Sequence, residues 1–333
     1  MAVLQVDVEA IGRNTEVVAG MLARHGIDLV GVTKACLGDA RVGAAMLAGG
    51  AVALADTRDQ NLQRLRATLP GVELHRIYLP PLNGFFEPGN ITYLSSLEGA
   101  RAVAARSGTG RKRQRVMIHL ETGDLRDGVP REDLVALVSA VVEDERLQLE
   151  GLSTNYACFE GTRDGVRESL RAIASAALEL RAAGFPVERV SGGNSSILWL
   201  VQRGETLPQE ITELRCGEAL LFGHDALCYE ELPGCRRDAC LLRVEVLEMY
   251  TKPAVGGRRR RLVLGIGRQD LGSGAIRFVH EGLSEIGRSA DYLVVEQAEV
   301  RSMPKVGDFV QMIPSYEALV AAWTSPYVER IVR

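Results

Sequence analysis

Eight short apolar runs alternate with helix-like segments over the first two thirds of the chain, and this alternation limits the fold more than any other feature of the sequence. The strand-like runs are Asp28–Thr33, Ala51–Ala55, Leu74–Tyr78, Ile91–Leu94, Val116–Leu120, Leu149–Ser153, Val187–Val190 and Glu213–Arg215. The helix-like segments include Arg41–Ala48, Asp59–Ala67, Leu97–Ala105, Arg131–Val142, Val166–Ala183 and Ser196–Gln202. Eight strands with intervening helices predict an α/β fold, a (β/α)₈ TIM barrel. A doubly wound open sheet is the alternative, but no glycine-rich fingerprint follows an early strand.

The pattern changes after about Ala226, where helical periodicity nearly vanishes. Strand-like runs separated by turn residues follow, at Arg243–Tyr250, Arg261–Ile266, Ile276–Val279, Asp291–Gln297 and Asp308–Met312. We therefore expect a barrel over residues 8–225 and a smaller β-rich domain over residues 226–333. The opening apolar segment, residues 1–7, is assigned to the β-rich domain.

Bulk composition excludes several classes of protein. Of the 333 residues, 46% are hydrophobic. The net charge is −4, so the composition does not indicate a positive electrostatic potential that would attract nucleic acid. Two basic runs, Arg111–Arg115 and Arg258–Arg261, are predicted to be solvated loops. The six cysteines show no metal-ligand spacing, and neither a signal peptide nor a membrane span is recognised. The composition predicts a cytoplasmic protein with free thiols and no metal.

Lys34 stands at the end of an apolar, β-branched run, where an ammonium group is costly to bury. Burial lowers the pKa of a lysine, and a neutral amine can form a Schiff base. The alternative is a side chain that extends from the strand end to solvent.

Further polar residues follow the later strands, at the barrel end where active sites lie. The run Ser191–Ser196 combines glycines with hydroxyls before a helix, which suits a phosphate, although its serines could simply cap that helix. Arg215 could face a heteroaromatic nitrogen or a carboxylate, or it could pair with Glu213 or Glu218. Arg126 could likewise bind a carboxylate or pair with Asp124 or Asp127.

These motifs, in this order, resemble the alanine-racemase-type, fold-type III pyridoxal-phosphate enzymes, and among them the ornithine-racemase branch. The resemblance covers nearly the whole chain. It is carried by Val32–Ala35, Glu121–Gly128, Ser191–Ser196, Leu214–Gly223, Gly265–Asp270 and Ser315–Leu319.

The resemblance implies a role for each matching residue. Lys34 would hold pyridoxal 5'-phosphate as a Schiff base and act as one acid/base at Cα. Arg215 would face the pyridine nitrogen, while Arg126, with Asn155 nearby, would orient the substrate carboxylate. The phosphate would be held by Gly193, Asn194, Ser195, the Gly217 and Glu218 amides, and the Tyr316 hydroxyl.

One position departs from the alanine-racemase pattern. The second base of that family is a tyrosine supplied across a dimer, but Arg268 occupies its place here, and arginine is a poor proton acceptor. There are two explanations for the missing tyrosine: Arg268 takes part in proton transfer in an unusual environment, or Lys34 acts on both faces of the substrate. Other candidates for the second acid/base are Asp270, Tyr316, Cys158 and Tyr156. The tyrosine that follows the cofactor lysine in the family is also absent, since Leu37 stands near that place.

The resemblance implies an isomerase, a racemase of ornithine or another basic amino acid, working as a homodimer with shared active sites. An acidic pocket for the substrate side chain could come from Glu121, Asp124, Asp127, Glu160 and Glu218. The alternatives are an alanine or broad-specificity racemase, then a decarboxylase or lyase on the same scaffold, then a non-catalytic cofactor-binding protein.

Overall fold

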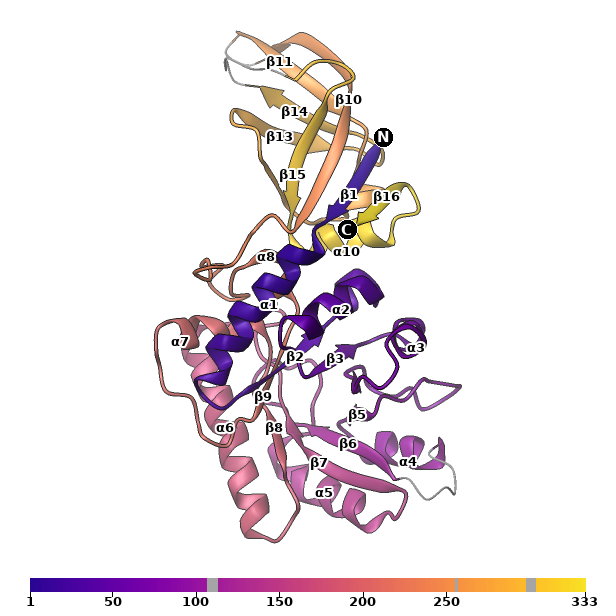
Figure 1. Ribbon diagram of the computed structural model, residues 1–333, viewed down its shortest axis with the longest axis vertical. Coiled ribbons are helices and arrows are strands. Elements are labelled where there is room, and N and C mark those ends of the chain that lie inside the picture. Colours follow the sequence, from indigo (N-terminus) through magenta and orange to yellow (C-terminus); the bar gives the residue numbers. More distant parts are fainter. Residues whose placement is uncertain (107–112, 255–256, 298–303) are drawn as a thin grey trace. The chain divides into compact units, whose positions relative to one another are not determined.

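The computed structural model describes residues 1–106, 113–254, 257–297 and 304–333 (Figure 1). The chain divides into two compact units. The barrel unit comprises residues 11–34 and 38–235, and the β-rich unit comprises residues 1–10, 35–37 and 236–333.

Eight parallel strands close the barrel in chain order (Figure 1). They are β2 (Asp28–Val32), β3 (Ala53–Asp56), β4 (Leu74–Arg76), β5 (Ile91–Leu94), β6 (Gln114–His119), β7 (Leu147–Ser153), β8 (Arg189–Ser191) and β9 (Glu213–Cys216). Pairing of β2 with β9, which sets Asp28 opposite Glu213, completes the ring. The predicted barrel is therefore confirmed, and the open sheet is excluded because it would leave two unpaired edges.

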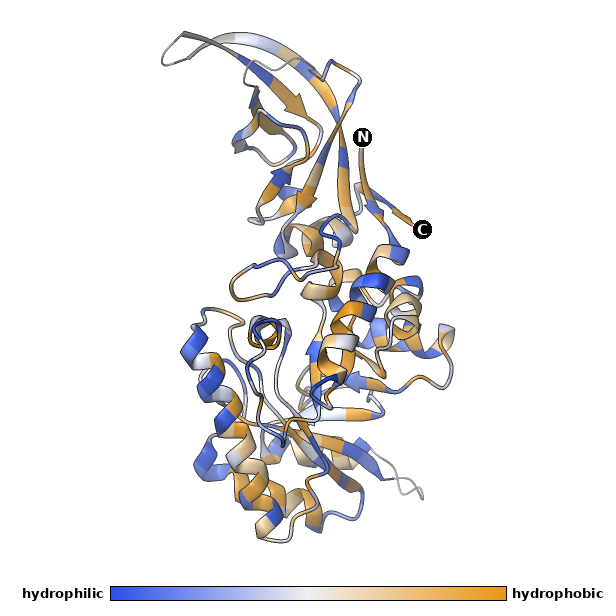
Figure 2. Cartoon of the chain, turned by 60° about the vertical axis from the view of Figure 1, so that its left-hand side comes forward, coloured by the Kyte–Doolittle hydropathy of each residue, from blue (hydrophilic) through white to orange (hydrophobic). Residues whose placement is uncertain are grey.

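Helices connect the strands close to the predicted positions. They are α1 (Val8–Ala23), α2 (Ala40–Ala48), α3 (Asp59–Thr68), α4 (Leu97–Arg106), α5 (Leu134–Glu143), α6 (Arg163–Ala182), α7 (Leu198–Gln202) and α8 (Glu218–Phe222), with short 3₁₀ turns η1 (Lys34–Cys36), η2 (Arg131–Asp133) and η3 (Ser195–Ile197). The longest, α6, buries a stripe that includes Leu170, Ile173 and Leu180. Figure 2 shows the same pattern on the helices of the barrel unit, where polar and apolar residues alternate along each helix.

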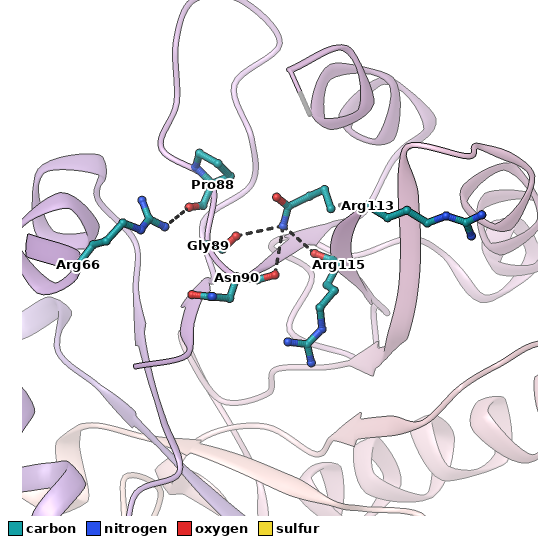
Figure 3. A pocket seen from close by; sticks show the side chains of 7 residues that line it. Arg66, Pro88, Gly89, Asn90, Arg113 and Arg115 are labelled. Carbon is teal, nitrogen blue, oxygen red and sulfur yellow. Dashed lines mark hydrogen bonds between the residues drawn. The ribbon is translucent and has the colours of Figure 1, made fainter. Parts of the chain in front are cut away.

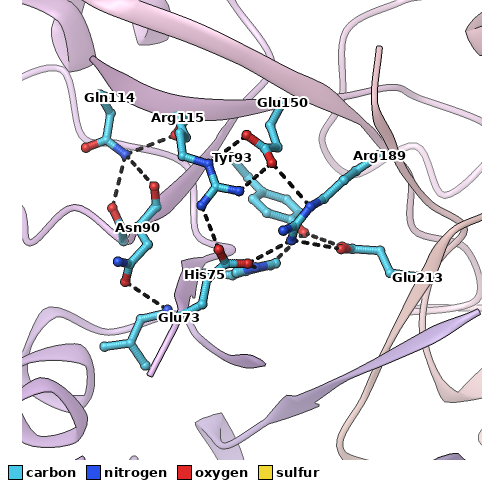
Figure 4. A network of polar contacts seen from close by, with 11 residues as sticks. Glu73, His75, Asn90, Tyr93, Gln114, Arg115, Glu150, Arg189 and Glu213 are labelled. Carbon is cyan, nitrogen blue, oxygen red and sulfur yellow. Dashed lines mark hydrogen bonds and ion pairs between the residues drawn. The ribbon is translucent and has the colours of Figure 1, made fainter. Parts of the chain in front are cut away.

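Charged side chains gather near the amino ends of the barrel strands (Figure 4). Arg115 donates to Glu73 Oε2 at 2.6 Å and to Glu150 Oε2 at 2.7 Å. Arg189 donates to Glu73 Oε1 at 2.7 Å and lies 3.7 Å from Glu213 Oε2. The prediction of a solvated loop is wrong for Arg115, because this side chain belongs to β6 and neutralises carboxylates, among them the buried Glu150. Arg111 and Lys112 of the same run lie outside the described residues.

The β-rich unit contains an eight-stranded sheet. Its elements are β1 (Ala2–Val6), β10 (Cys240–Ala254), β11 (Gly257–Leu264), α9 (Arg268–Leu271), β12 (Ile276–Phe278), β13 (Leu283–Arg288), β14 (Leu293–Gln297), β15 (Phe309–Pro314), α10 (Tyr316–Thr324) and β16 (Val328–Val332). The first strand pairs antiparallel with β10 and parallel with β16. The basic run Arg258–Arg261 lies within β11, so its prediction as a loop is wrong: its backbone pairs with β10.

None of the helices in the described ranges is long and apolar enough to cross a membrane.

Candidate active site

Lys34 follows the carboxyl end of β2 and is half-buried. Burial lowers the pKa of Lys34 below its ordinary value. Negative charge on Cys158 and Asp56 opposes this change, whereas the guanidinium groups of Arg126 and Arg215 reinforce it. A lowered pKa increases the fraction of neutral amine, which is the form that attacks a carbonyl. The side chain therefore has the environment expected of a Schiff-base lysine.

The carboxylate of Asp56 is held firmly at the end of the neighbouring strand. Its Oδ2 accepts a 2.6 Å hydrogen bond from Thr33 Oγ1, and its Oδ1 accepts from Thr57 N at 2.6 Å and Asn61 Nδ2 at 2.9 Å. Asp56 is fully buried, and desolvation raises the pKa of its carboxyl group. These bonds fix the carboxylate in the neighbourhood of Lys34.

Arg215 is a buried cation at the end of β9. It donates to Ser191 Oγ and, at 2.5 Å, to the Thr154 carbonyl, and its guanidinium lies 5.2 Å from the centre of the Tyr93 ring. The two hydrogen bonds go to uncharged acceptors, so neither neutralises the guanidinium. A ring nitrogen facing this group would stay unprotonated, because arginine keeps its proton.

Arg126, in the loop after β6, is 34% exposed. Its Nε lies 2.9 Å from Asp127 Oδ1 and 3.7 Å from Asp124 Oδ2, so the pairing with aspartates left open by the sequence is present. In the described part of the chain these carboxylates pair with Nε, which leaves the outer guanidinium nitrogens for a bidentate contact with a carboxylate.

His119 lies beneath this loop at the end of β6 and was not singled out from the sequence. Its Nδ1 is 2.9 Å from Ser153 Oγ, and its Nε2 is 3.6 Å from Asp127 Oδ1. Burial lowers the pKa of His119, while its contact with Asp127 helps to hold the pKa of that carboxyl below the usual range. The sequence did contain a signal for His119, which is a polar residue at the end of an apolar strand. The same kind of signal identified Lys34.

The loops after β7 and β8 meet through two amide side chains. Asn194 Nδ2 donates to Asn155 Oδ1 at 3.0 Å and to the Tyr156 carbonyl at 3.1 Å, and Asn194 Oδ1 accepts from Ser196 N at 2.7 Å. Asn194 is thus the cap of the turn η3, whereas the alternative that the sequence left open was a serine cap. Gly193 adopts a φ of 133°, which other residues rarely allow.

The next loop brings Gly217 and Glu218 to the same region. Ser195 Oγ accepts a 3.3 Å hydrogen bond from Ala219 N, which joins the β8 loop to the start of α8. A Cβ atom at Gly217 would lie only 2.9 Å from the Val32 carbonyl, so this loop can lie against β2 only because the residue is glycine. Backbone amides and a hydroxyl therefore collect beside the strand that carries Lys34.

Three predicted residues belong to the β-rich unit. Arg268 is exposed at the start of α9, and Tyr316 is half-buried at the start of α10. Asp270 is buried, where it accepts from Ser325 Oγ at 2.7 Å and from Gly267 N at 3.3 Å. These bonds give Asp270 a structural task as a helix cap, and the predicted roles of all three residues stay predictions.

A shallow cavity of about 240 Å³ lies at the opposite end of the barrel (Figure 3). It is lined by Arg66, Pro88, Gly89, Asn90, Arg113, Gln114 and Arg115. Because β5 and β6 begin here, this cavity is remote from the strand ends that carry Lys34. Among the described residues, no cluster of histidine, cysteine and acidic side chains could hold a metal ion.

Residues 6–225 match the family described as "Alanine racemase, N-terminal domain". The chain belongs to this family. It is 28% identical to a lysine racemase of Thermotoga maritima, over 98% of this chain and 97% of that protein. It is 30% identical to an ornithine racemase of Acetoanaerobium sticklandii, over 83% of this chain and 84% of that protein.

Solved structures agree on the fold. An alanine racemase from Streptomyces coelicolor superposes with a TM-score of 0.75 at 20% identity, covering 99% of this chain and 97% of the other. An alanine racemase from Bartonella henselae with covalently bound pyridoxal phosphate gives 0.73 at 18% identity, covering 100% and 99%. The predicted family, fold and enzyme class, an amino-acid racemase, are confirmed.

Proposed function

We propose that this chain is a pyridoxal-phosphate-dependent racemase that interconverts the enantiomers of a basic amino acid, ornithine or lysine. The observation that carries the proposal is Lys34, a half-buried lysine of lowered pKa among the charged residues at the barrel mouth. A basic substrate is supported by the names of two relatives that match most of this chain, a lysine racemase and an ornithine racemase.

The residues present fit the cofactor. Lys34 would carry it, the Gly193–Ser195 loop and the amides of Gly217 and Glu218 would hold its phosphate, and Arg215 would face its ring nitrogen. The fit rests on two features: the close approach of Gly217 to β2, and the hydrogen bonds of Arg215 to two uncharged acceptors, Ser191 Oγ and the Thr154 carbonyl. When bound, pyridoxal phosphate supplies the electron sink that makes a Cα proton labile.

The chain's own residues then position the substrate and move the proton. The outer nitrogens of Arg126 take the α-carboxylate, while Asp127 holds the guanidinium from behind. Lys34 Nζ removes or returns the Cα proton on one face. Glu121 and Glu160, on the loops after β6 and β7, are the proposed source of negative charge for a second ammonium group. As the resemblance implies, we propose a homodimer in which the partner's β-rich unit completes the site, and a cytoplasmic location.

Two measurements test this function. Purified protein given L-ornithine, L-lysine or L-alanine in D₂O should form the D-enantiomer with deuterium at Cα, fastest for a basic substrate. Lys34→Ala should abolish the visible band of the bound cofactor, whereas Lys305→Ala, at an exposed lysine of the β-rich unit, should keep it. Failure to interconvert any of the three amino acids would refute the proposal, and carbon dioxide release would indicate a decarboxylase instead.

A further inference from the structure

Cys158 differs from the other five cysteines in its environment. None of the six forms a disulfide, and Cys158, on the loop after β7, is the exposed one. Its exposure makes the thiol accessible to a ligand at the barrel mouth.

Hydrogen-bond donors and positive charges surround the sulfur. Asn155 Nδ2 donates to Cys158 Sγ at 2.5 Å, and Asn194 Nδ2 lies 3.9 Å from the same atom. Lys34 and Arg126 are its charged neighbours, because Cys158 is the largest influence, after burial, on the pKa of each. The thiol therefore faces two amide donors and two basic side chains at the strand ends that carry Lys34.

The backbone fixes this sulfur in place. Ala157 adopts a left-handed φ of 63°, and Cys158 N donates to the buried Asp124 Oδ1 at 2.9 Å. A non-glycine residue in this region carries strain, and such strain is concentrated at functional sites.

The strand order places the amine and the thiol on different strand ends. Lys34 follows β2 and Cys158 follows β7, and β9 and β8 lie between these strands on the shorter way around the ring. A ligand held over the strand ends can therefore meet the amine and the thiol from two directions.

We propose that Cys158 is the second acid/base of the racemase, an inference that rests on the proposed function. Lys34 Nζ takes the Cα proton from one face, and the Cys158 S–H delivers its proton to the other face. The reaction leaves an ammonium and a thiolate, and transfer of one proton from Nζ to Sγ through water restores both groups. The reverse direction exchanges their roles, so no further reactant is required. Arg268 then needs no proton-transfer role.

The test compares Cys158→Ala and Cys158→Ser with Cys228→Ser, a half-buried thiol bonded to Arg163 on the same unit. General acid–base groups contribute about 10²–10⁴-fold, so enantiomer interconversion should fall at least 100-fold in both Cys158 variants. Deuterium should still enter Cα of one enantiomer with retention of configuration, because Lys34 remains. Cys228→Ser should behave as the parent.

A second readout does not depend on turnover. In the parent protein at pH 7, iodoacetamide should alkylate the exposed Cys158 about tenfold faster than Cys235, a half-buried thiol of the same unit whose pKa burial raises to about 11, as followed by mass spectrometry of the two peptides. Racemisation within threefold of the parent in Cys158→Ala, or equal alkylation of the two thiols, would overturn this inference alone. Failure of the parent to racemise any amino acid would instead overturn the proposed function.

Discussion

The ion network at the amino ends of the barrel strands predicts a large loss of stability when Arg115 is replaced by methionine. This residue pairs with Glu73 and with Glu150, whose side chain is 5% exposed. Without Arg115, the described contacts of the three glutamates with basic side chains are those of Arg189, together with His75 beside Glu73. Breaking a buried ion pair from one side costs about 3–5 kcal/mol, and we take the lower end because the Arg115 side chain is 24% exposed.

A loss of about 3 kcal/mol corresponds to a melting temperature roughly 6–12 °C lower for a unit of this size. Circular dichroism at 222 nm reports this transition, because most helical residues belong to the barrel unit. Arg146→Met is the matched control. Arg146 pairs with Asp144 at the surface, and its loss should change the melting temperature little.

The effect should also depend on pH with a defined sign. Hydrogen bonds from His75, Arg115 and Arg189 hold the pKa of Glu73 well below its ordinary value. A lowered carboxyl pKa contributes stability above the unfolded-state pKa of about 4.3, and this contribution is lost as the pH falls. The difference between parent and Arg115→Met should therefore persist at pH 7 and shrink below about pH 4. A melting temperature within 2 °C of the parent at pH 7, or a difference that grows in acid, would refute the reasoning.

Two further substitutions probe the active site. Asp127→Asn removes the charge that holds Arg126 Nε at 2.9 Å. Loss of a charge-assisted hydrogen bond, taken at its lower value of about 1.5 kcal/mol, predicts a roughly tenfold higher KM at similar kcat. Chiral chromatography of the two enantiomers measures both constants. Unchanged KM would remove Arg126 from substrate binding. Gly193→Ala forces a side chain onto a backbone φ of 133°, at a cost of about 1–3 kcal/mol. Equilibrium dialysis should therefore show at least fivefold weaker cofactor retention, with Gly184→Ala on the surface as the control. Equal retention by both variants would contradict the assignment of this loop to the phosphate.

The barrel could be predicted from the sequence because its strands are buried on both faces. Ile91–Leu94 was located without error, since its four consecutive buried residues are all β-branched, aromatic or aliphatic. The strand β13 was missed because its residues, Leu283–Arg288, are half-buried or exposed and carry no such run. Helix α10 and strand β16 were missed in the same part of the chain, where short elements gave no clear periodicity.

The strand-end positions of Lys34 and Arg215 were predictable, because each follows or ends an apolar strand, while their roles stay predictions. Polar side chains whose partners are distant in sequence could not be placed in this way, at either end of the barrel. Arg115 looks like part of a basic loop, yet its partners Glu73 and Glu150 lie 42 and 35 residues away. His119 is likewise explained by Ser153 on the neighbouring strand, a contact that no local pattern reveals.

The pairing of β1 with both β10 and β16 has a consequence for synthesis on the ribosome. The first strand is translated before its partners, which are Cys240 onward and then Val328–Val332. Its backbone groups therefore stay unpaired with these strands while every barrel strand is translated. The barrel can close first, and the β-rich sheet can be completed only once Val328–Val332 have left the ribosome. Deletion of residues 328–333 should therefore leave a folded barrel attached to a sheet that exposes one edge of β1 to other chains.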